Sequence, residues 1–147
     1  MIHIDSEIVV SNSIHDIFTY LNSPGNHARF IPNMIHFNQT SLGAFGRVGA
    51  KANGILNILG VNIKISYELI EHEPDRRLAM KGSLGPLLFK DGYVLEIVGN
   101  KTKIKFWLEI DVRGVLILFQ SLTSLIAKLH ARETLQNLRR ELEHIPN

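Results

Sequence analysis

Alternating apolar and polar residues open the chain and predict a strand at residues 2–10. Ile2, Ile4, Ile8 and Val10 share one parity, and charged or polar side chains stand between most of them. A period of two residues is typical of a strand with one buried face and one solvated face. We therefore expect the first strand of a sheet here.

Two short helices are expected next. Ser13 and Asp16 have the spacing of a capping box, in which the serine hydroxyl accepts a hydrogen bond from a free amide at the helix start. Ser23 followed by Pro24 predicts a second start, because the amide that proline lacks has no partner at that position. Pro32 then ends the segment. We expect the two helices to form a V.

Six further strands follow as an antiparallel meander. The last of them alternates most clearly, since every even position from Ile104 to Val112 is apolar. No connection is long enough for a crossover helix, so one apolar face of the sheet is left needing a partner. Turn residues separate the six segments, which we place at residues 34–41, 47–58, 61–72, 76–83, 87–98 and 102–112.

A helical period after Gly114 supplies that partner. We predict a helix at residues 115–144 that packs on the apolar face of the sheet; a break near His130–Glu133 is the alternative to a continuous helix. At about 1.5 Å per residue it reaches about 45 Å, enough to cross the sheet. The expected contact stripe is Val115, Leu118, Leu122, Leu125, Leu129, Leu138, Leu142 and Ile145. The class is α+β, with a seven-stranded curved antiparallel sheet.

Composition narrows the class of protein. The 147 residues fit one domain, residues 1–147, and the formal charge of +2 is too small for the phosphate contacts of a nucleic-acid partner. Without cysteine there is no disulfide or thiol nucleophile. The start does not resemble a secretion signal, and the longest apolar run, residues 115–119, is too short for a transmembrane segment. We expect a cytoplasmic protein, with peripheral membrane contact left open.

Small residues mark one face of the segment 47–58. Ala50, Ala52 and Gly54 occupy consecutive positions of one parity, where a filled core would carry large side chains. One interpretation is that they leave space for a cavity. The other is that they allow the sheet to bend and the helix to come close.

Three polar side chains are candidates for a site on the inner face. Tyr67 and Tyr93 are in phase with inward apolar neighbours, and their hydroxyls could orient a ligand or lie at the rim in water. Asp91 has the parity of Tyr93, so a continuous strand points its carboxyl inward, where burial raises the pKa and suits general-acid catalysis. Alternatively, Asp91 and Gly92 form a hairpin turn, or Gly92 is a bulge that resets parity. Asp91 is thus a weak catalytic candidate, and no catalytic residue is assigned.

The sequence favours neither a metal nor a cofactor. The seven histidines show no close ligand spacing, so we expect them on the surface. His130 and Glu133 lie one helical turn apart; they form an exposed pair or face the cavity. A Gly-x-Ser-x-Gly elbow is missing, as are phosphate-loop and dinucleotide fingerprints.

Several short motifs and the order of elements carry a resemblance to a known superfamily. The motifs are Ser13-Ile-His-Asp-Ile-Phe-Thr-Tyr-Leu, Ser23-Pro-Gly-Asn26, Phe30-Ile-Pro32, Gly46-Arg-Val-Gly49, Glu71-His-Glu-Pro74 with Arg76-Arg-Leu78, and Leu138-Arg-Arg-Glu141-Leu. They resemble the START-like, helix-grip superfamily, also called SRPBCC, which includes birch-pollen allergens and polyketide cyclases. The resemblance covers essentially the whole chain and is greatest to the polyketide cyclase/dehydrase and carbon-monoxide-dehydrogenase-subunit-G-like branches. It implies a helix-grip fold whose cavity, between the long helix and the curved sheet, holds an apolar or amphipathic small molecule.

We therefore expect a binding protein rather than an enzyme, with a lipid, an isoprenoid quinone or a polycyclic aromatic molecule as ligand. The alternatives are a polyketide cyclase or aromatase-like enzyme, and an accessory protein that docks on another enzyme or a membrane through Trp107 and residues 115–119. The identity of the ligand and the oligomeric state stay open. The expected ligand-binding residues are Ala50, Ala52, Gly54, Leu56, Ile65, Tyr67, Met80, Phe89, Tyr93, Phe106, Leu108, Leu118, Leu122, Leu125 and Leu129.

Overall fold

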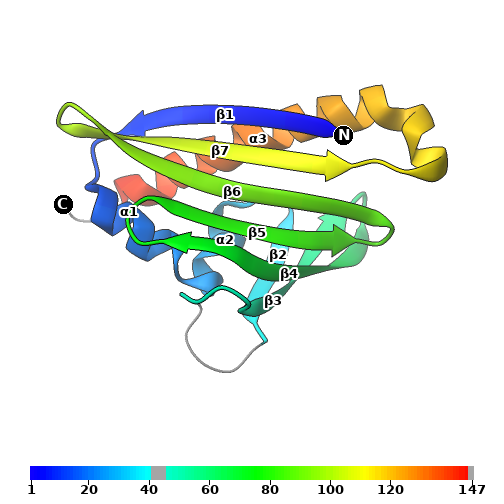
Figure 1. Ribbon diagram of the computed structural model, residues 1–147, viewed down its shortest axis with the longest axis horizontal. Helices are drawn as coiled ribbons and strands as arrows, with labels where there is room; N and C mark the ends of the chain where they lie inside the picture. Colours follow the sequence, from blue (N-terminus) through cyan, green and yellow to red (C-terminus); the bar gives the residue numbers. More distant parts are fainter. Residues whose placement is uncertain (41–45, 146–147) are drawn as a thin grey trace.

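Seven antiparallel strands form one curved sheet in the computed structural model, which describes residues 1–40 and 46–145 (Figure 1). The strands lie in the order β1-β7-β6-β5-β4-β3-β2, so β1 and β2 form opposite edges. This confirms the predicted α+β architecture. The strands are β1 (Ile2–Val10), β2 (Met34–Gln39), β3 (Lys51–Ile58), β4 (Val61–Glu73), β5 (Arg77–Leu84), β6 (Leu87–Val98) and β7 (Lys101–Asp111).

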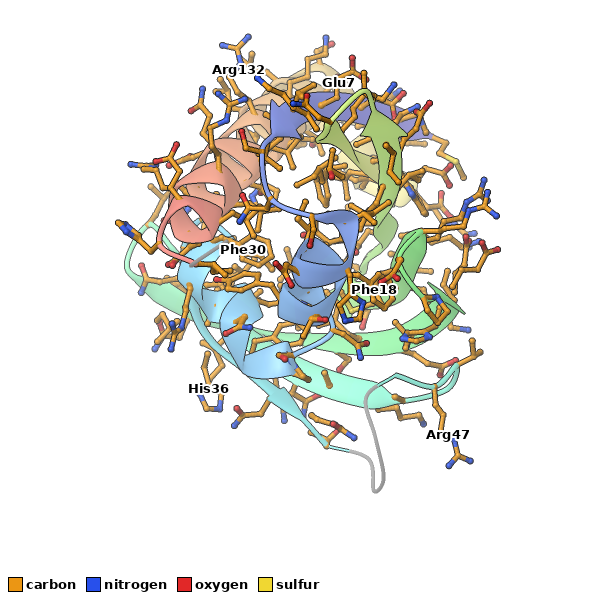
Figure 2. The ribbon with its side chains drawn as sticks, turned by 90° about the vertical axis from the view of Figure 1, so that its left-hand side faces the viewer. Glu7, Phe18, Phe30, His36, Arg47 and Arg132 are labelled. Carbon is orange, nitrogen blue, oxygen red and sulfur yellow. The ribbon has the colours of Figure 1, made fainter. Side chains whose placement is uncertain are left out.

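Two short helices connect the opposite edges of the sheet. They are α1 (Ile14–Leu21) and α2 (Pro24–Phe30). The capping prediction for α1 is confirmed, because the Asp16 amide donates a hydrogen bond of 3.2 Å to the Ser13 hydroxyl. Phe18 and Phe30 are buried among the elements that surround them, whereas His36 is exposed on the outside (Figure 2). The short helices thereby close one end of the sheet.

The C-terminal helix is shorter than predicted. A 3-10 helix, η1 (Gly114–Phe119), follows the last strand, and the α-helix α3 (Gln120–Glu143) begins only after it. Gly114, with φ of +63°, turns the chain out of β7. The alternative break near His130 does not occur, since α3 is continuous across that position. Among the described residues, no helix is long and apolar enough to cross a membrane.

Polar contacts hold the C-terminal half of α3 in place. The Asn12 side-chain amide donates a hydrogen bond of 3.0 Å to the carbonyl of Leu142, and that of Asn137 donates one of 3.1 Å to the carbonyl of Phe30. The helix packs mainly against β1, with further contacts to α2 and β7. Figure 1 shows α3 running along the β1 and β7 side of the sheet.

The predicted contact stripe of α3 is correct only in its C-terminal half. Leu138 and Leu142 are buried and Ile145 is partly buried against the core. The side chain of Val115 lies outside the described residues. The packing prediction is wrong for Leu118, which is 83% exposed, and for Leu122, Leu125 and Leu129, each 55% exposed.

The physical reason is that the N-terminal half of α3 has two faces without charge. Ala127 and Ala131 are buried toward the sheet, and at about 100° per residue the exposed leucines lie on the opposite side of the helix. Small side chains let the helix approach the sheet. The prediction chose the face with the larger apolar side chains, and in the structure that face is the exposed one. The buried positions of α3 are Ala127, Ala131, Thr134, Leu135, Leu138 and Leu142.

His27 corrects the prediction that the histidines lie on the surface. Its ring is fully buried, stacks on Phe37 at a centroid distance of 4.9 Å, and its Nε2 donates a hydrogen bond of 2.6 Å to the Leu21 carbonyl. Its Nδ1 has no partner among the described residues. Burial lowers the pKa of His27 to about 4, although the hydrogen bond to Leu21 acts in the opposite direction. The ring is therefore neutral near pH 7.

Replacing His27 with glutamine is expected to weaken the acid sensitivity of the fold. Since the folded pKa lies below the unfolded value of 6.5, the wild-type protein loses stability as the pH falls from 6.5 toward 4. The free energy of unfolding of wild type relative to His27→Gln should fall by about 2.4 kcal/mol between pH 7 and pH 4.5. Urea unfolding of both proteins measures this difference, and a constant difference would contradict the neutral buried ring.

Candidate ligand-binding site

A cavity of about 290 Å³ lies between the sheet and the N-terminal half of α3. Its lining is mainly apolar and comes from β3 to β7, from residues 31–33 and from α3. Its volume is at the lower end of the range for small-molecule sites, about 300 Å³ and above. Ile58 and Ile126 line it and are 39% and 59% exposed, so the cavity opens to solvent beside them.

Many of the predicted binding residues on the strands line this cavity. All of them have the inward parity that the alternation predicts, and they come from β3, β4, β6 and β7. They are Leu56, Ile65, Tyr67, Phe89, Tyr93, Phe106 and Leu108.

The remaining predicted residues lie elsewhere. Met80 is buried in the core but does not line the cavity, and neither do the four exposed leucines of η1 and α3 described above.

The small residues of β3 do not open the cavity, which corrects that interpretation. A Cβ atom on Gly54 would lie 2.8 Å from the Sδ of Met34, so the space beside this glycine is taken by a side chain of β2. Ala50 and Ala52 are buried and also lie outside the lining of this cavity, although Ala52 lines the larger hollow described below. The space beside Gly54 is occupied by β2 and not by the helix that the alternative named.

The sequence-based prediction missed the part of the lining that comes from α3 and from the loop before β2. Thr123, Ala127, His130 and Thr134 recur at three- and four-residue spacing, a small or polar helical stripe opposite the leucines. That stripe was the available signal, because a helix that borders a cavity presents short side chains to it. His130 was one of the two alternatives given above. The missed residues of these two parts are Ile31, Pro32, Asn33, Thr123, Ile126, Ala127 and Thr134, and those on the strands are Ile58, Leu84, Leu87 and Ile110.

Asp91 points into the cavity from the middle of β6. The strand is continuous, and Asp91 pairs with Met80 on one side and Leu108 on the other, so the hairpin-turn and bulge alternatives do not occur. The Oδ1 atom is shielded from solvent and has no hydrogen-bond partner among the described residues. Burial raises the pKa of this carboxyl to about 7.

The neighbouring Gly92 faces the outer side of the sheet, where Trp107 crosses it. A Cβ atom there would lie 2.9 Å from the Cε2 of Trp107 and 2.8 Å from the carbonyl oxygen of Leu78. Trp107 thus packs on the outer face of the sheet, and a side chain at position 92 would displace it.

Tyr67 and Tyr93 line the same cavity as Asp91 and are 6% and 3% exposed, so their side chains are buried and do not lie at a rim in water. Burial and, secondly, the charge of Asp91 raise the pKa of each well above its ordinary value, so both hydroxyls stay protonated. Neither hydroxyl has a hydrogen bond to another residue in the part of the chain described. These groups are therefore free to bind a ligand.

His130 faces the same cavity from α3. Burial lowers its pKa, against the smaller influence of Glu133, so the imidazole is neutral near pH 7. Glu133 itself is exposed and does not line the cavity. The two residues therefore do not act as a pair inside it.

Comparison with solved structures decides the fold family. No protein-family model and no curated protein matches the chain. A START superfamily protein from Mycobacterium smegmatis superposes with a TM-score of 0.79 at 11% identity, over 98% of this chain and 99% of that one. The chain has the START-like fold. A conserved protein from Geobacillus kaustophilus (TM-score 0.76, 15% identity, 97% and 95% coverage) and major latex-like protein 151 from Panax ginseng (0.71, 13%, 98% and 97%) have the same architecture.

The START-like fold places this cavity between the sheet and the long helix, where the resemblance implied it. The proposed membership of a particular branch of the superfamily stays a prediction, because likeness at this level of identity concerns the fold alone. Within residues 1–40 and 46–145, no group of three or more histidine, aspartate or glutamate side chains is arranged to hold a metal ion.

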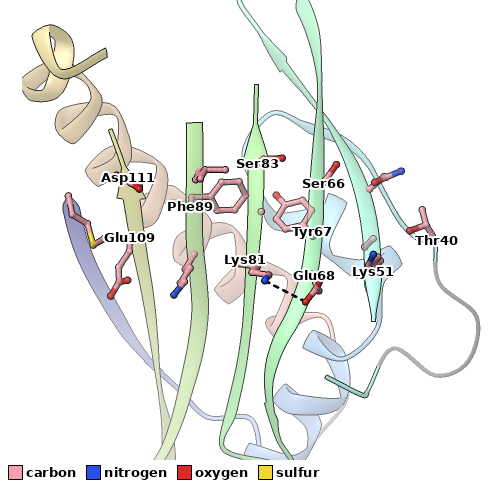
Figure 3. A pocket seen from close by; sticks show the side chains of 16 residues that line it. Thr40, Lys51, Ser66, Tyr67, Glu68, Lys81, Ser83, Phe89, Glu109 and Asp111 are labelled. Carbon is pink, nitrogen blue, oxygen red and sulfur yellow. Dashed lines mark ion pairs between the residues drawn. The ribbon is translucent and has the colours of Figure 1, made fainter. Parts of the chain in front are cut away.

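A second, larger hollow of about 720 Å³ lies on the sheet, where charged and polar side chains line it together with Ala52, Leu88 and Phe89 (Figure 3). Its charges alternate across the strands from Lys51 to Glu68 and Lys81, and the Lys81 Nζ lies 3.7 Å from a carboxylate oxygen of Glu68. Opposite charges that pair across neighbouring strands stabilise a solvated sheet face. We therefore assign the functional site to the smaller cavity beneath α3.

Proposed function

We propose that this protein binds a hydrophobic or amphipathic small molecule in the cavity between the sheet and α3. The observation that carries the proposal is an apolar cavity that contains the unpartnered Oδ1 atom of Asp91 and is also lined by Tyr67 and Tyr93. Because the cavity opens to solvent, its apolar lining is in contact with water when no ligand is bound, and covering that lining contributes about 25 cal/mol per Å² of apolar surface. A ligand would cover this surface and hydrogen-bond the polar groups.

The dimensions narrow the ligand. A space of about 290 Å³ suits a compact ring system, or one end of a longer lipid or isoprenoid quinone. The opening beside Ile58 and Ile126 would let the rest of a longer molecule extend outward. The apolar part of the ligand would contact the aromatic and aliphatic side chains, and its polar end would meet Asp91.

Filling the mouth of the cavity is expected to abolish binding of a neutral apolar probe. Thr123 lines the cavity and is only partly buried, so Thr123→Phe adds a ring there with little disturbance of the core. N-phenyl-1-naphthylamine fluorescence should show at least a tenfold loss of affinity. The matched control is Leu125→Phe, at an exposed position of the same helix outside the cavity. Unchanged binding to Thr123→Phe would place the probe site elsewhere, and no binding to the wild type would overturn the proposal.

A second candidate function is catalysis of the polyketide cyclase or aromatase type. The specific observation in its favour is the Asp91 carboxyl, whose pKa of about 7 suits proton transfer near neutral pH. Loss of a general acid or base lowers a rate by about 10²- to 10⁴-fold. Mass spectrometry of the organic extract of the purified protein would identify a bound molecule. Its conversion by wild type but not by Asp91→Asn, with binding retained, would establish the enzyme in place of the binding protein.

A further inference from the structure

We propose that the ligand carries a protonated amine, which pairs with the Asp91 carboxylate among the aromatic side chains of the cavity. This inference rests on the proposed binding function and specifies the chemical class of the ligand. Three features of the site support it: aromatic rings lie beside Asp91, no cationic side chain of the described residues pairs with it, and a carboxylate can pair with a positive charge.

Among the residues that the structure describes, none places a positive charge beside Asp91. Along β6 its inward neighbours are Phe89 and Tyr93, and across the sheet it pairs with Met80 and Leu108. In the described part of the chain, the carboxyl makes no ion pair or hydrogen bond with another residue. A buried carboxylate without a partner is strongly unfavourable, so this group either keeps its proton or awaits a cation.

Aromatic rings flank the carboxyl on both sides. The rings of Tyr67 and Phe89 meet edge to face at a centroid distance of 5.5 Å, and those of Tyr93 and Phe106 lie 5.1 Å apart. Gly82 makes the first contact possible, since a Cβ atom there would lie 2.6 Å from the Cζ of Phe89. Aromatic faces attract an ammonium group, and a carboxylate and phenolic oxygens can accept its hydrogen bonds.

Within residues 1–40 and 46–145, the other elements that line this part of the cavity supply no charge to it. β4 presents Tyr67 and β6 presents Tyr93, both protonated phenols. α3 presents His130, which burial keeps neutral near pH 7. β5 and β7 contribute uncharged residues. A ligand with its own carboxylate would therefore meet only negative or neutral groups here.

A neutral ligand head does not account for an aspartate at this position. Asparagine or serine could hydrogen-bond a hydroxyl or carbonyl without a charge that is costly to bury. Charge pairing is what a carboxyl adds, and its strength increases in an apolar cavity. An ammonium ligand would hold Asp91 in the ionised form, and its binding would therefore release a proton from the protein.

Three probes with the same ring system test the inference: 1-naphthylmethylamine, 1-naphthalenemethanol and 1-naphthoate. Calorimetric titration at pH 7 is expected to show the amine binding at least tenfold more tightly than the alcohol, and the acid most weakly. Repeating the amine titration in buffers of different ionisation enthalpy should show proton release by the wild-type protein. This measurement needs no variant, so it stands even if a substitution at position 91 disturbs folding.

Asp91→Asn is the matched variant, because it keeps the shape and removes the charge. It should abolish the preference for the amine over 1-naphthalenemethanol. Equal affinities of amine and alcohol in the wild type, or an amine preference that survives Asp91→Asn, would overturn the inference. Binding of the alcohol that is lost in Thr123→Phe would still support the proposed function in that case. Failure of all three probes to bind would overturn the proposed function as well.

Discussion

Leu138→Asp is expected to prevent folding or to lower the free energy of unfolding by about 5 kcal/mol or more, whereas Leu122→Asp leaves it within about 0.5 kcal/mol. Leu138 is completely buried where α3 packs on the rest of the core, so the variant loses apolar burial and places a carboxylate in the interior. Leu122 is 55% exposed on the opposite side of the same helix. An aspartate at position 122 would therefore be solvated and would change the stability little.

Circular dichroism and urea unfolding of the two variants measure the difference. Because both changes introduce the same residue into the same helix, intrinsic helix propensity cancels. The helix dipole favours an acid in the first turn, at Leu122, by no more than about 1 kcal/mol, so the rest of the contrast reports which face contacts the sheet. A strongly destabilised Leu122→Asp beside a stable Leu138→Asp would mean that α3 is rotated relative to the arrangement described above.

Asp91→Asn is expected to become more stable than the wild type as the pH rises from about 4 to about 7. The folded pKa of about 7 lies above the unfolded value near 3.8, so the folded wild-type protein holds the extra proton in this window. Its stability therefore falls as the pH rises, and asparagine does not titrate. The total change is about 4 kcal/mol, at about 1.4 kcal/mol per pH unit.

Urea unfolding of ligand-free wild type and Asp91→Asn at pH 4.5, 6 and 7.5 gives this difference. His27 changes the stability with pH in the opposite direction, but it is present in both proteins, so its contribution cancels in the comparison. Above pH 7 and below pH 4 the difference should be flat. A difference that does not change with pH would show that the Asp91 carboxyl is solvated in the folded protein.

The fold was predictable because its determinants are local. Alternation along the strand around Ile104 and Phe106, and the cap at Ser13, depend on residues close together in the chain. Parity likewise predicted the inward direction of Tyr67 and Phe89, which line the cavity. These predictions needed no knowledge of where a distant segment would pack.

The cavity wall formed by α3 was not predictable in the same way. Periodicity shows that a helix has an apolar face, but Leu122 and Ala127 lie on opposite sides, and either side could meet a sheet. In the structure, the face of α3 with small side chains contacts the sheet, because small side chains let the helix come close to it. His27 was hidden for a related reason, since its burial arises from the packing of α2 against β2.

By itself, the sequence determined the α+β class, the strands, their inward residues and the need for a helix to cover them. Only the tertiary structure decided which side of that helix covers the sheet, and that β6 continues through Asp91 so that its carboxyl is enclosed. Local periodicity depends on backbone geometry within a few residues, whereas burial depends on elements brought together from across the chain.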